Sequence, residues 1–293
     1  CFDIWNEISK TPYDTDFENR NGTKGEFVEV YINGEYHGLY CMTDKIDRKL
    51  LGLKKAKENN DGSVNIRGLL YKGSAWTVAT GLGGYDASKS FDEETWNGWE
   101  LQYPDDYPCY DAWKPLMDLI DFCNTDINYF KENYRKYFYY DNLVDYALFI
   151  MGNNIIDNLM KNTHLSCSDI NVNKTFLITP WDLDCSLGGL YEGSHYEENT
   201  KLTNLIENKL YNQLYIYNVN NFCTNMKDRW QELLSNIMSV DKFNSRLDSY
   251  AKIFRESGAW QREYDKWNNH EGKHNICKDR TCILINKDSS LAE

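Results

Sequence analysis

A predicted β-hairpin with polar residues at its open end is the feature that most constrains the fold. Thr163–Cys167 and Thr175–Thr179 follow strand-like patterns and are joined by the polar turn Ser168–Lys174. Antiparallel pairing brings the residue before the first strand next to the residues after the second. We therefore expect Asn162 and the turn Pro180–Asp182 to lie close together.

The oxygen atoms expected at this hairpin end are typical ligands of a divalent cation. Asn162 supplies an amide oxygen, and Asp182 and Asp184 supply carboxylates, which Mg²⁺ and Mn²⁺ prefer. Taken alone, the two aspartates are better explained as a turn or a helix cap. Several carboxylates placed together repel one another unless a cation neutralises them, so their convergence with Asp157 favours a metal site.

Asp157 precedes Asn162 by five residues, which is the spacing of the protein-kinase catalytic loop. In that loop the aspartate positions the substrate hydroxyl and the asparagine binds a metal ion. Here Ile155 and Ile156 replace the His-Arg pair that normally precedes the aspartate. The pattern also occurs often by chance, so the spacing alone does not identify a kinase.

Strand patterns dominate the first part of the chain. Alternation of apolar and polar residues in Glu26–Tyr31 and Tyr36–Met42, on either side of Asn33-Gly34, predicts a β-hairpin. The other elements expected there are a helix over Asp47–Lys57, strands over Ile66–Lys72 and Trp99–Tyr103, and a surface loop containing Gly81, Gly83 and Gly84.

The second part of the chain is mainly helical. A helical period of apolar residues begins near Tyr110, and Asn142–Met151 is apolar enough to be a buried helix. A β-rich part followed by a helical part that contains one hairpin predicts an α+β, two-lobed, protein-kinase-like fold. Three amphipathic helices are expected near the end of the chain, over Phe222–Met238, Val240–Arg255 and Gly258–Trp267.

The expected domains are a β-rich N-lobe covering a nucleotide, a helical C-lobe with the catalytic hairpin, and a C-terminal extension of unknown role. They occupy residues 1–109, 110–268 and 269–293 respectively. The net charge of −13 argues against a nucleic-acid binder, because phosphate contacts need a basic face. No apolar run approaches the roughly 18 residues of a transmembrane helix.

Nine cysteines occur without the paired spacing that a structural zinc site would show. Cys277 and Cys282 either form a small disulfide loop or stay reduced, depending on the compartment. No signal peptide is visible, and the abrupt helix-like start at Cys1 is compatible with a missing leader or first strand. The residues alone therefore leave the compartment open.

Three motifs, in order and at matching spacing, resemble the spore-coat protein H (CotH) kinase family. The resemblance covers about residues 1–268. It implies a kinase-like fold that transfers phosphate from ATP to Ser, Thr or Tyr of secreted or cell-envelope proteins, with Mg²⁺ or Mn²⁺ as cofactor. The motifs are Phe27–Tyr40 with Lys45-Ile46-Asp47, Asp157-Asn158 with Lys161-Asn162, and Pro180–Asp184 with Leu187-Gly188.

The resemblance also implies roles for individual residues. Asp157 would be the catalytic aspartate, and Lys161 would touch the transferred phosphoryl group. Asn162 and Asp182 would bind metal, with Asp184 as a second aspartate ligand.

In the first lobe, the resemblance implies that Lys72 pairs with the ATP phosphates and that Glu100 is its ion-pair partner. Lys45 competes with Lys72 for this role. Two departures from the family weaken the nucleotide contacts: Thr43-Asp44-Lys45 lacks the expected glutamate, and a full glycine-rich loop is absent. The hairpin at Asn33-Gly34-Glu35 would have to cover the phosphates instead.

Two other functions remain open at this level. The same departures suit an inactive pseudokinase that serves as a structural or scaffolding protein of the envelope or coat. A carbohydrate-binding module is a third hypothesis, and it would require Trp76, Trp96 and Trp99 to be exposed.

Overall fold

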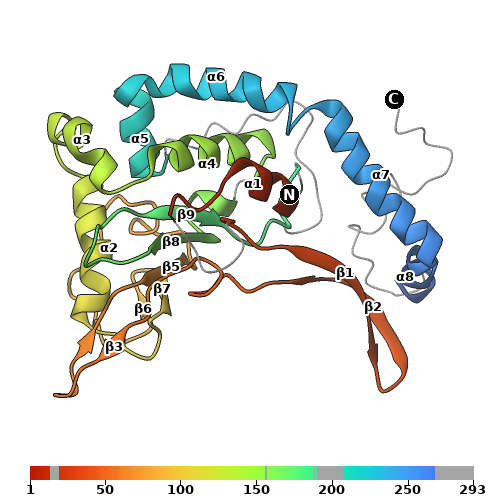
Figure 1. Ribbon diagram of the computed structural model, residues 1–293, viewed down its shortest axis with the longest axis horizontal. Helices are drawn as coiled ribbons and strands as arrows, with labels where there is room; N and C mark the ends of the chain where they lie inside the picture. The colour runs from red at the N-terminus through yellow and green to blue at the C-terminus, as the bar shows by residue number, and fades with distance from the viewer. Residues whose placement is uncertain (14–19, 156, 188, 190–206, 268–293) are drawn as a thin grey trace.

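The computed structural model describes residues 1–13, 20–155, 157–187, 189 and 207–267. Within them the chain is mixed α+β: helices cover a five-stranded sheet, and a long hairpin projects from one side (Figure 1). The expected C-terminal extension, with Cys277 and Cys282, lies outside these residues. The cysteines that the structure describes are free, and no helix in the described ranges is long and apolar enough to cross a bilayer.

Strands from both halves of the sequence form the central sheet. Its order is β6-β7-β5-β8-β9, and every neighbouring pair is antiparallel. The expected boundary at residue 109 therefore falls between strands of one sheet, and the two-lobed division stays a prediction. The strands are β5 (Leu69–Gly73), β6 (Thr95–Trp96), β7 (Trp99–Tyr103), β8 (Thr163–Cys167) and β9 (Leu177–Pro180).

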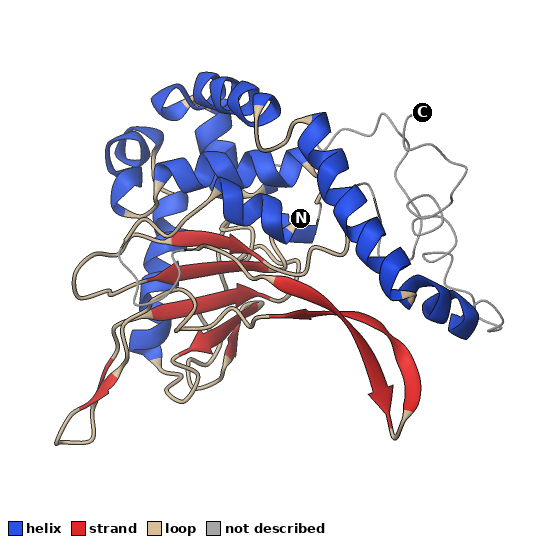
Figure 2. Cartoon of the chain, turned by 45° about the vertical axis from the view of Figure 1, so that its right-hand side comes forward, coloured by secondary structure: helices blue, strands red, loops and turns tan. Residues whose placement is uncertain are grey.

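Helices lie above the sheet in Figure 2, and α4 is the most deeply buried of them. The apolar sequence of α4 predicted this burial, which supplies much of the core. The helices are α1 (Phe2–Ile8), α2 (Tyr110–Cys123), α3 (Ile127–Asn133), α4 (Tyr140–Gly152), α5 (Lys209–Ile216), α6 (Phe222–Ser235), α7 (Val240–Ser257) and α8 (Ala259–Trp267), with the 3₁₀ turns η1 (Tyr134–Lys136), η2 (Asp157–Leu159) and η4 (Val219–Asn221).

The predicted first hairpin is confirmed as β1 (Gly25–Ile32) and β2 (Glu35–Thr43). Both turn residues have positive φ, Asn33 at 53° and Gly34 at 85°, as this tight turn requires. The hairpin packs against α8, where Arg262 donates to both carboxylate oxygens of Glu29, at 2.7 and 2.8 Å. The last helices therefore hold the projecting hairpin in place.

The prediction of a helix over Asp47–Lys57 is wrong. The segment forms a short turn and then β3 (Lys57–Glu58), which pairs with β4 (Val64–Asn65). Gly52, with φ of 62°, ends the turn, and Leu51 and Leu53 are buried in a small cluster with Leu70. Burial of these leucines against the sheet outweighs the local helical propensity.

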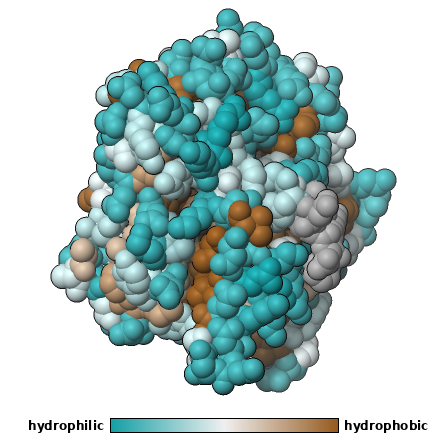
Figure 3. Space-filling model, turned by 60° about the vertical axis from the view of Figure 1, so that its left-hand side comes forward, coloured by the Kyte–Doolittle hydropathy of each residue, from teal (hydrophilic) through white to brown (hydrophobic). Residues whose placement is uncertain are grey.

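The glycine segment is a loop, as expected, and Gly83 is exposed, but part of the loop is packed into the core. Gly81 is buried, and a Cβ atom there would lie 3.0 Å from the Cε atom of Met160. Trp96 and Trp99 are each only 1% exposed, so they cannot form a sugar-binding platform. The face in Figure 3 is mostly hydrophilic, as expected when the large aromatic side chains fill the core.

Candidate active site

The open end of the β8–β9 hairpin brings the expected site residues together. Thr163 pairs with Pro180, and beyond them Trp181 N donates to Asn162 O at 2.9 Å. Asn162 and Asp182 therefore lie side by side just beyond the paired strands. Asn162 Nδ2 donates a hydrogen bond to Asp182 Oδ2 at 3.2 Å. The proximity predicted from the two strand patterns is confirmed.

One amide group connects the two candidate aspartates. Asn162 Nδ2 also donates to Asp157 Oδ2, at 2.9 Å, so Asp157 and Asp182 share one donor. Asp157 lies in η2, before β8, and Asp182 follows β9, so the two aspartates meet at the same open end of the hairpin. This is the arrangement that the spacing of Asp157 and Asn162 predicted.

Two of these residues adopt unusual backbone conformations. Asn162 and Asp182 have φ of 55° and 56°, in the left-handed region. Asn and Asp tolerate this region better than other residues with a side chain, and such conformations cluster at functional sites because surrounding contacts must maintain them. The strain at both positions indicates that the geometry of this corner is strongly imposed.

Asn158 imposes it. This residue is fully buried, and its Nδ2 donates to Asn162 O and to Trp181 O, both at 2.7 Å. Its own carbonyl accepts a hydrogen bond from Tyr146 OH, at 2.6 Å. Asn158 appeared in the sequence only as the neighbour of Asp157, and nothing local indicated that it would join the two ends of the hairpin.

Two further side chains hold the Asp157 carboxylate. Lys161 Nζ lies 3.3 Å from Asp157 Oδ2, and Trp76 Nε1 donates to Asp157 Oδ1 at 2.9 Å. Trp76 is 45% exposed, so its ring borders the site while its N–H orients the carboxylate. From the sequence, Trp76 was predicted only as a sugar-binding residue, and its contact with Asp157 was not predicted.

The site is crowded with negative charge. Burial raises the pKa of Asp182 above its ordinary value, and the carboxylates of Asp184 and Asp157 raise it further. Lys161 and Lys72 act in the opposite direction, which means that both ammonium groups lie close enough to influence Asp182. The local charge is therefore only partly balanced by the protein.

Lys72 and Glu100 lie opposite each other on β5 and β7. Lys72 Nζ is 3.9 Å from Glu100 Oε2, and both side chains are partly exposed. In protein kinases the corresponding glutamate comes from a helix, whereas here it comes from the neighbouring strand. His164 pairs with Lys72 on the other side, where burial and the Lys72 charge lower its pKa to about 3, so His164 stays neutral.

The remaining two candidates are less engaged. Lys45 is exposed in the segment after β2, whereas Lys72 makes the ion pair with Glu100. Asp184 is also exposed, and its Oδ1 accepts a hydrogen bond from Cys185 N at 2.8 Å. Asp184 acts on the site through its charge on Asp182.

The oxygen ligands at this site suit a divalent cation whose coordination shell is completed by phosphates or water. No group of three or more His, Cys, Asp or Glu side chains in the described residues forms a ready-made metal site. Asp157 and Asp182 instead provide two carboxylates, which both accept hydrogen bonds from the Nδ2 group of Asn162. A divalent cation with few protein ligands suits this set, as Mg²⁺ commonly does beside nucleotide phosphates.

We expect Trp76→Phe to lower kcat about tenfold for any reaction that uses Asp157 as its base. Phenylalanine keeps an aromatic ring beside the site but removes the N–H that orients the carboxylate. A hydrogen bond to a charged group has about the corresponding free energy. Steady-state kinetics should show a change in kcat with little change in KM for the nucleotide, and Trp267→Phe, at the end of α8, serves as a matched control. A KM effect alone would contradict the orienting role.

Comparison with known proteins gives one family and no curated relative. The family model described as CotH kinase protein matches residues 1–284. No curated protein matches the chain.

Proposed function

Because the chain belongs to the CotH kinase protein family, we propose that it is a protein kinase of secreted or cell-envelope proteins. It would transfer the γ-phosphoryl group of ATP to a Ser, Thr or Tyr hydroxyl. One observation supports this reaction above all: the amide group of Asn162 bridges Asp157 and Asp182. Catalysis of phosphoryl transfer is mainly positioning and charge neutralisation, which is what such a corner provides.

Asp157 has the role of the base in this proposal. Its carboxylate is held on Oδ1 by Trp76 and on Oδ2 by Asn162 and Lys161, so it can point at an incoming hydroxyl. The hydroxyl oxygen forms a bond to the γ-phosphorus while the bond from that phosphorus to the bridging oxygen of ADP breaks. Asp157 takes the hydroxyl proton, and Lys161 lies beside the transferred group.

Asn162 and Asp182 would hold Mg²⁺ or Mn²⁺, and Asp184 contributes charge nearby. A divalent cation held there would supply positive charge to the β- and γ-phosphates of ATP. Lys72 would bind the phosphates from the neighbouring strand, with Glu100 keeping its ammonium group in place. The two-lobed division and the covering role of the β1–β2 hairpin follow from the family and belong to the same proposal.

Incubation with ATP and Mn²⁺ tests the function directly. Wild-type protein should phosphorylate itself or an added protein, and Lys72→Met should reduce transfer by raising KM for ATP. Lys45→Met is the matched control, because Lys45 is exposed outside the Lys72–Glu100 pair. If the wild-type protein transferred no phosphate from ATP with either Mn²⁺ or Mg²⁺, the proposal would be contradicted.

A thermal-shift titration separates a kinase from a scaffold. A ligand that binds only the native state raises the unfolding temperature, so ATP with Mn²⁺ should stabilise a kinase. The stabilisation should require both the nucleotide and the metal. A scaffolding protein should show no metal-dependent effect of ATP.

A further inference from the structure

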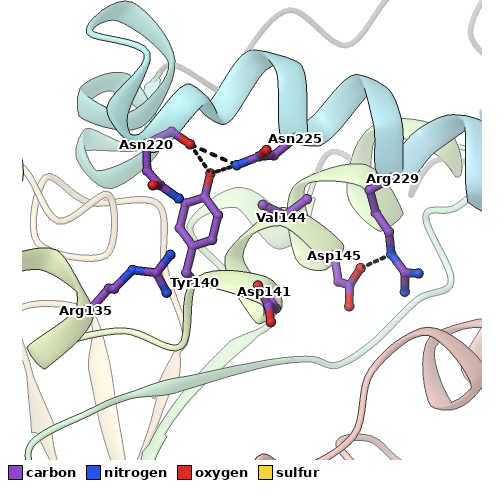
Figure 4. A pocket seen from close by; sticks show the side chains of 8 residues that line it. All are labelled: Arg135, Tyr140, Asp141, Val144, Asp145, Asn220, Asn225 and Arg229. Carbon is purple, nitrogen blue, oxygen red and sulfur yellow. Dashed lines mark hydrogen bonds and ion pairs between the residues drawn. The ribbon is translucent and has the colours of Figure 1, made fainter.

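A polar pocket lies beside the first half of α4 (Figure 4). Its volume is about 590 Å³, within the usual range of ligand sites. None of its lining residues belongs to the candidate active site, which lies beyond the C-terminal end of α4. The lining residues come from η1, α4, η4 and α6 and are Arg135, Tyr140, Asp141, Val144, Asp145, Asn220, Asn225 and Arg229.

Arg135 offers a fixed positive charge at one side of this pocket. Its guanidinium carbon lies 4.9 Å from the ring centre of Tyr140 and 5.4 Å from that of Tyr134. Contact with two rings restricts the side chain before any ligand binds. The Arg135 side chain also hydrogen-bonds the side chain of Tyr134, but it makes no ion pair with any residue that the structure describes, so its guanidinium can still pair with a carboxylate.

Asp141 offers the opposite charge. It is exposed in the first turn of α4, close to Tyr140, and within the described ranges it has no cationic partner. Asp145 differs, because it is mostly buried and accepts from Arg229 Nε at 2.8 Å. Arg229 also pairs with Glu232, at 2.8 Å, so these three charges are paired with one another. Arg135 and Asp141 are the charges of this pocket that have no ion-pair partner among the described residues.

The rim of the pocket is organised in advance. Asn225 Nδ2 donates to Asn220 O and to Tyr140 OH, both at 2.8 Å, and Tyr140 OH donates to Asn220 O at 3.3 Å (Figure 4). Asn220 has φ of 52°, and Asn218 and Asn221 beside it are also left-handed. A rim held this way loses little conformational freedom on binding, which favours affinity.

A second cavity extends the pocket along the surface. It has a volume of about 400 Å³ and shares Arg135, Tyr140, Asp141 and Asp145 with the first. It reaches the segment Ile8–Pro12 after α1. Two cavities joined through the same charged residues make an elongated groove, which suits an extended chain better than a compact small molecule.

We propose that this groove binds an extended peptide segment of a partner protein that carries both an acidic and a basic side chain. The acidic side chain pairs with Arg135 through two parallel hydrogen bonds. The basic side chain pairs with Asp141, on the other side of Tyr140. This site is separate from the candidate active site, and its occupation does not depend on phosphoryl transfer.

Fluorescence anisotropy of the full chain with three labelled peptides tests the groove. The peptides have equal length and an uncharged Ala/Gln background, and they carry one Glu and one Lys, two Glu, or two Lys residues. The mixed peptide should bind most tightly. Arg135→Gln and Asp141→Asn should each weaken its binding about tenfold or more, since each removes a charged hydrogen-bonding partner.

Lys131→Gln is the matched control, because this exposed lysine of α3 lines neither cavity. It should bind the mixed peptide as the wild type does. Equal binding of all three peptides, preference for the two-Glu peptide, or an unchanged affinity in Arg135→Gln would each overturn the proposal. Failure of the kinase assay leaves this result unaffected, so the two proposals can fail independently.

Discussion

Replacing Asp182 by alanine should reduce phosphoryl transfer by at least about 10²-fold while leaving the protein folded. The carboxylate is one of the two that Asn162 bridges, and in the proposed reaction its loss removes a ligand of the divalent cation. Asp182 as a whole residue is exposed, but its carboxyl group is partly desolvated. This desolvation and the neighbouring carboxylates disfavour its charged form. Removing that charge offsets part of the cost of alanine at this left-handed position, so the free energy of unfolding of the metal-free protein should fall by no more than about 1 kcal/mol.

The measurement combines transfer from labelled ATP with thermal unfolding in the presence and absence of Mn²⁺ and ATP. Asp182→Ala should lose both the transfer and the stabilisation by Mn²⁺ and ATP. Asp105→Ala is the matched control, because Asp105 is an exposed carboxylate after β7 and away from the hairpin end. Transfer at the wild-type rate in Asp182→Ala would exclude this carboxylate as a metal ligand.

The hairpin end was predictable from sequence because its contacts are local along the chain. β8 and β9 are consecutive strands joined by a polar turn, and their antiparallel pairing alone brings Asn162 and Asp182 together. Asp157 follows because η2 directly precedes β8. Local pairing rules are sufficient for this part of the site.

The contribution of Trp76 was not predictable in the same way. Trp76 follows β5, and its distance from Asp157 depends on the pairing of β5 with β8 across more than 80 residues of sequence. The same pairing places Gly73 O in a hydrogen bond with Asn162 N at 2.8 Å. A Cβ atom on Gly73 would lie 2.2 Å from Met160 O, so only glycine permits this approach.

Long-range contacts also determine features that the sequence did not reveal. The sheet formed by β5, β7 and β8 joins strands from both sides of residue 109, a pairing that no single segment of the sequence indicates, and the domain boundary there stays a prediction. Leu51 and Leu53 turn inward to meet Leu70 of β5, which prevents the helix expected there. Periodicity within one segment contains no information about such partners.

Asn158→Ala should destabilise the protein by about 3 kcal/mol and also reduce phosphoryl transfer. Two hydrogen bonds from a fully buried amide disappear, and Trp181 O loses the donor that Asn158 provides. Each lost bond at a buried site costs roughly 1–3 kcal/mol. Urea unfolding should show the loss, and Asn128→Ala is the control, because Asn128 is exposed on α3 and alanine suits a helix.

Asn158→Asp distinguishes hydrogen bonding from packing. Aspartate has nearly the same shape as asparagine but lacks the N–H donors, so its oxygens would face the carbonyl oxygens of Asn162 and Trp181. It should therefore be at least as destabilising as alanine, although it leaves no cavity. Wild-type stability in Asn158→Asp would mean that the side chain only fills space, and the left-handed conformations of Asn162 and Asp182 would then need another support.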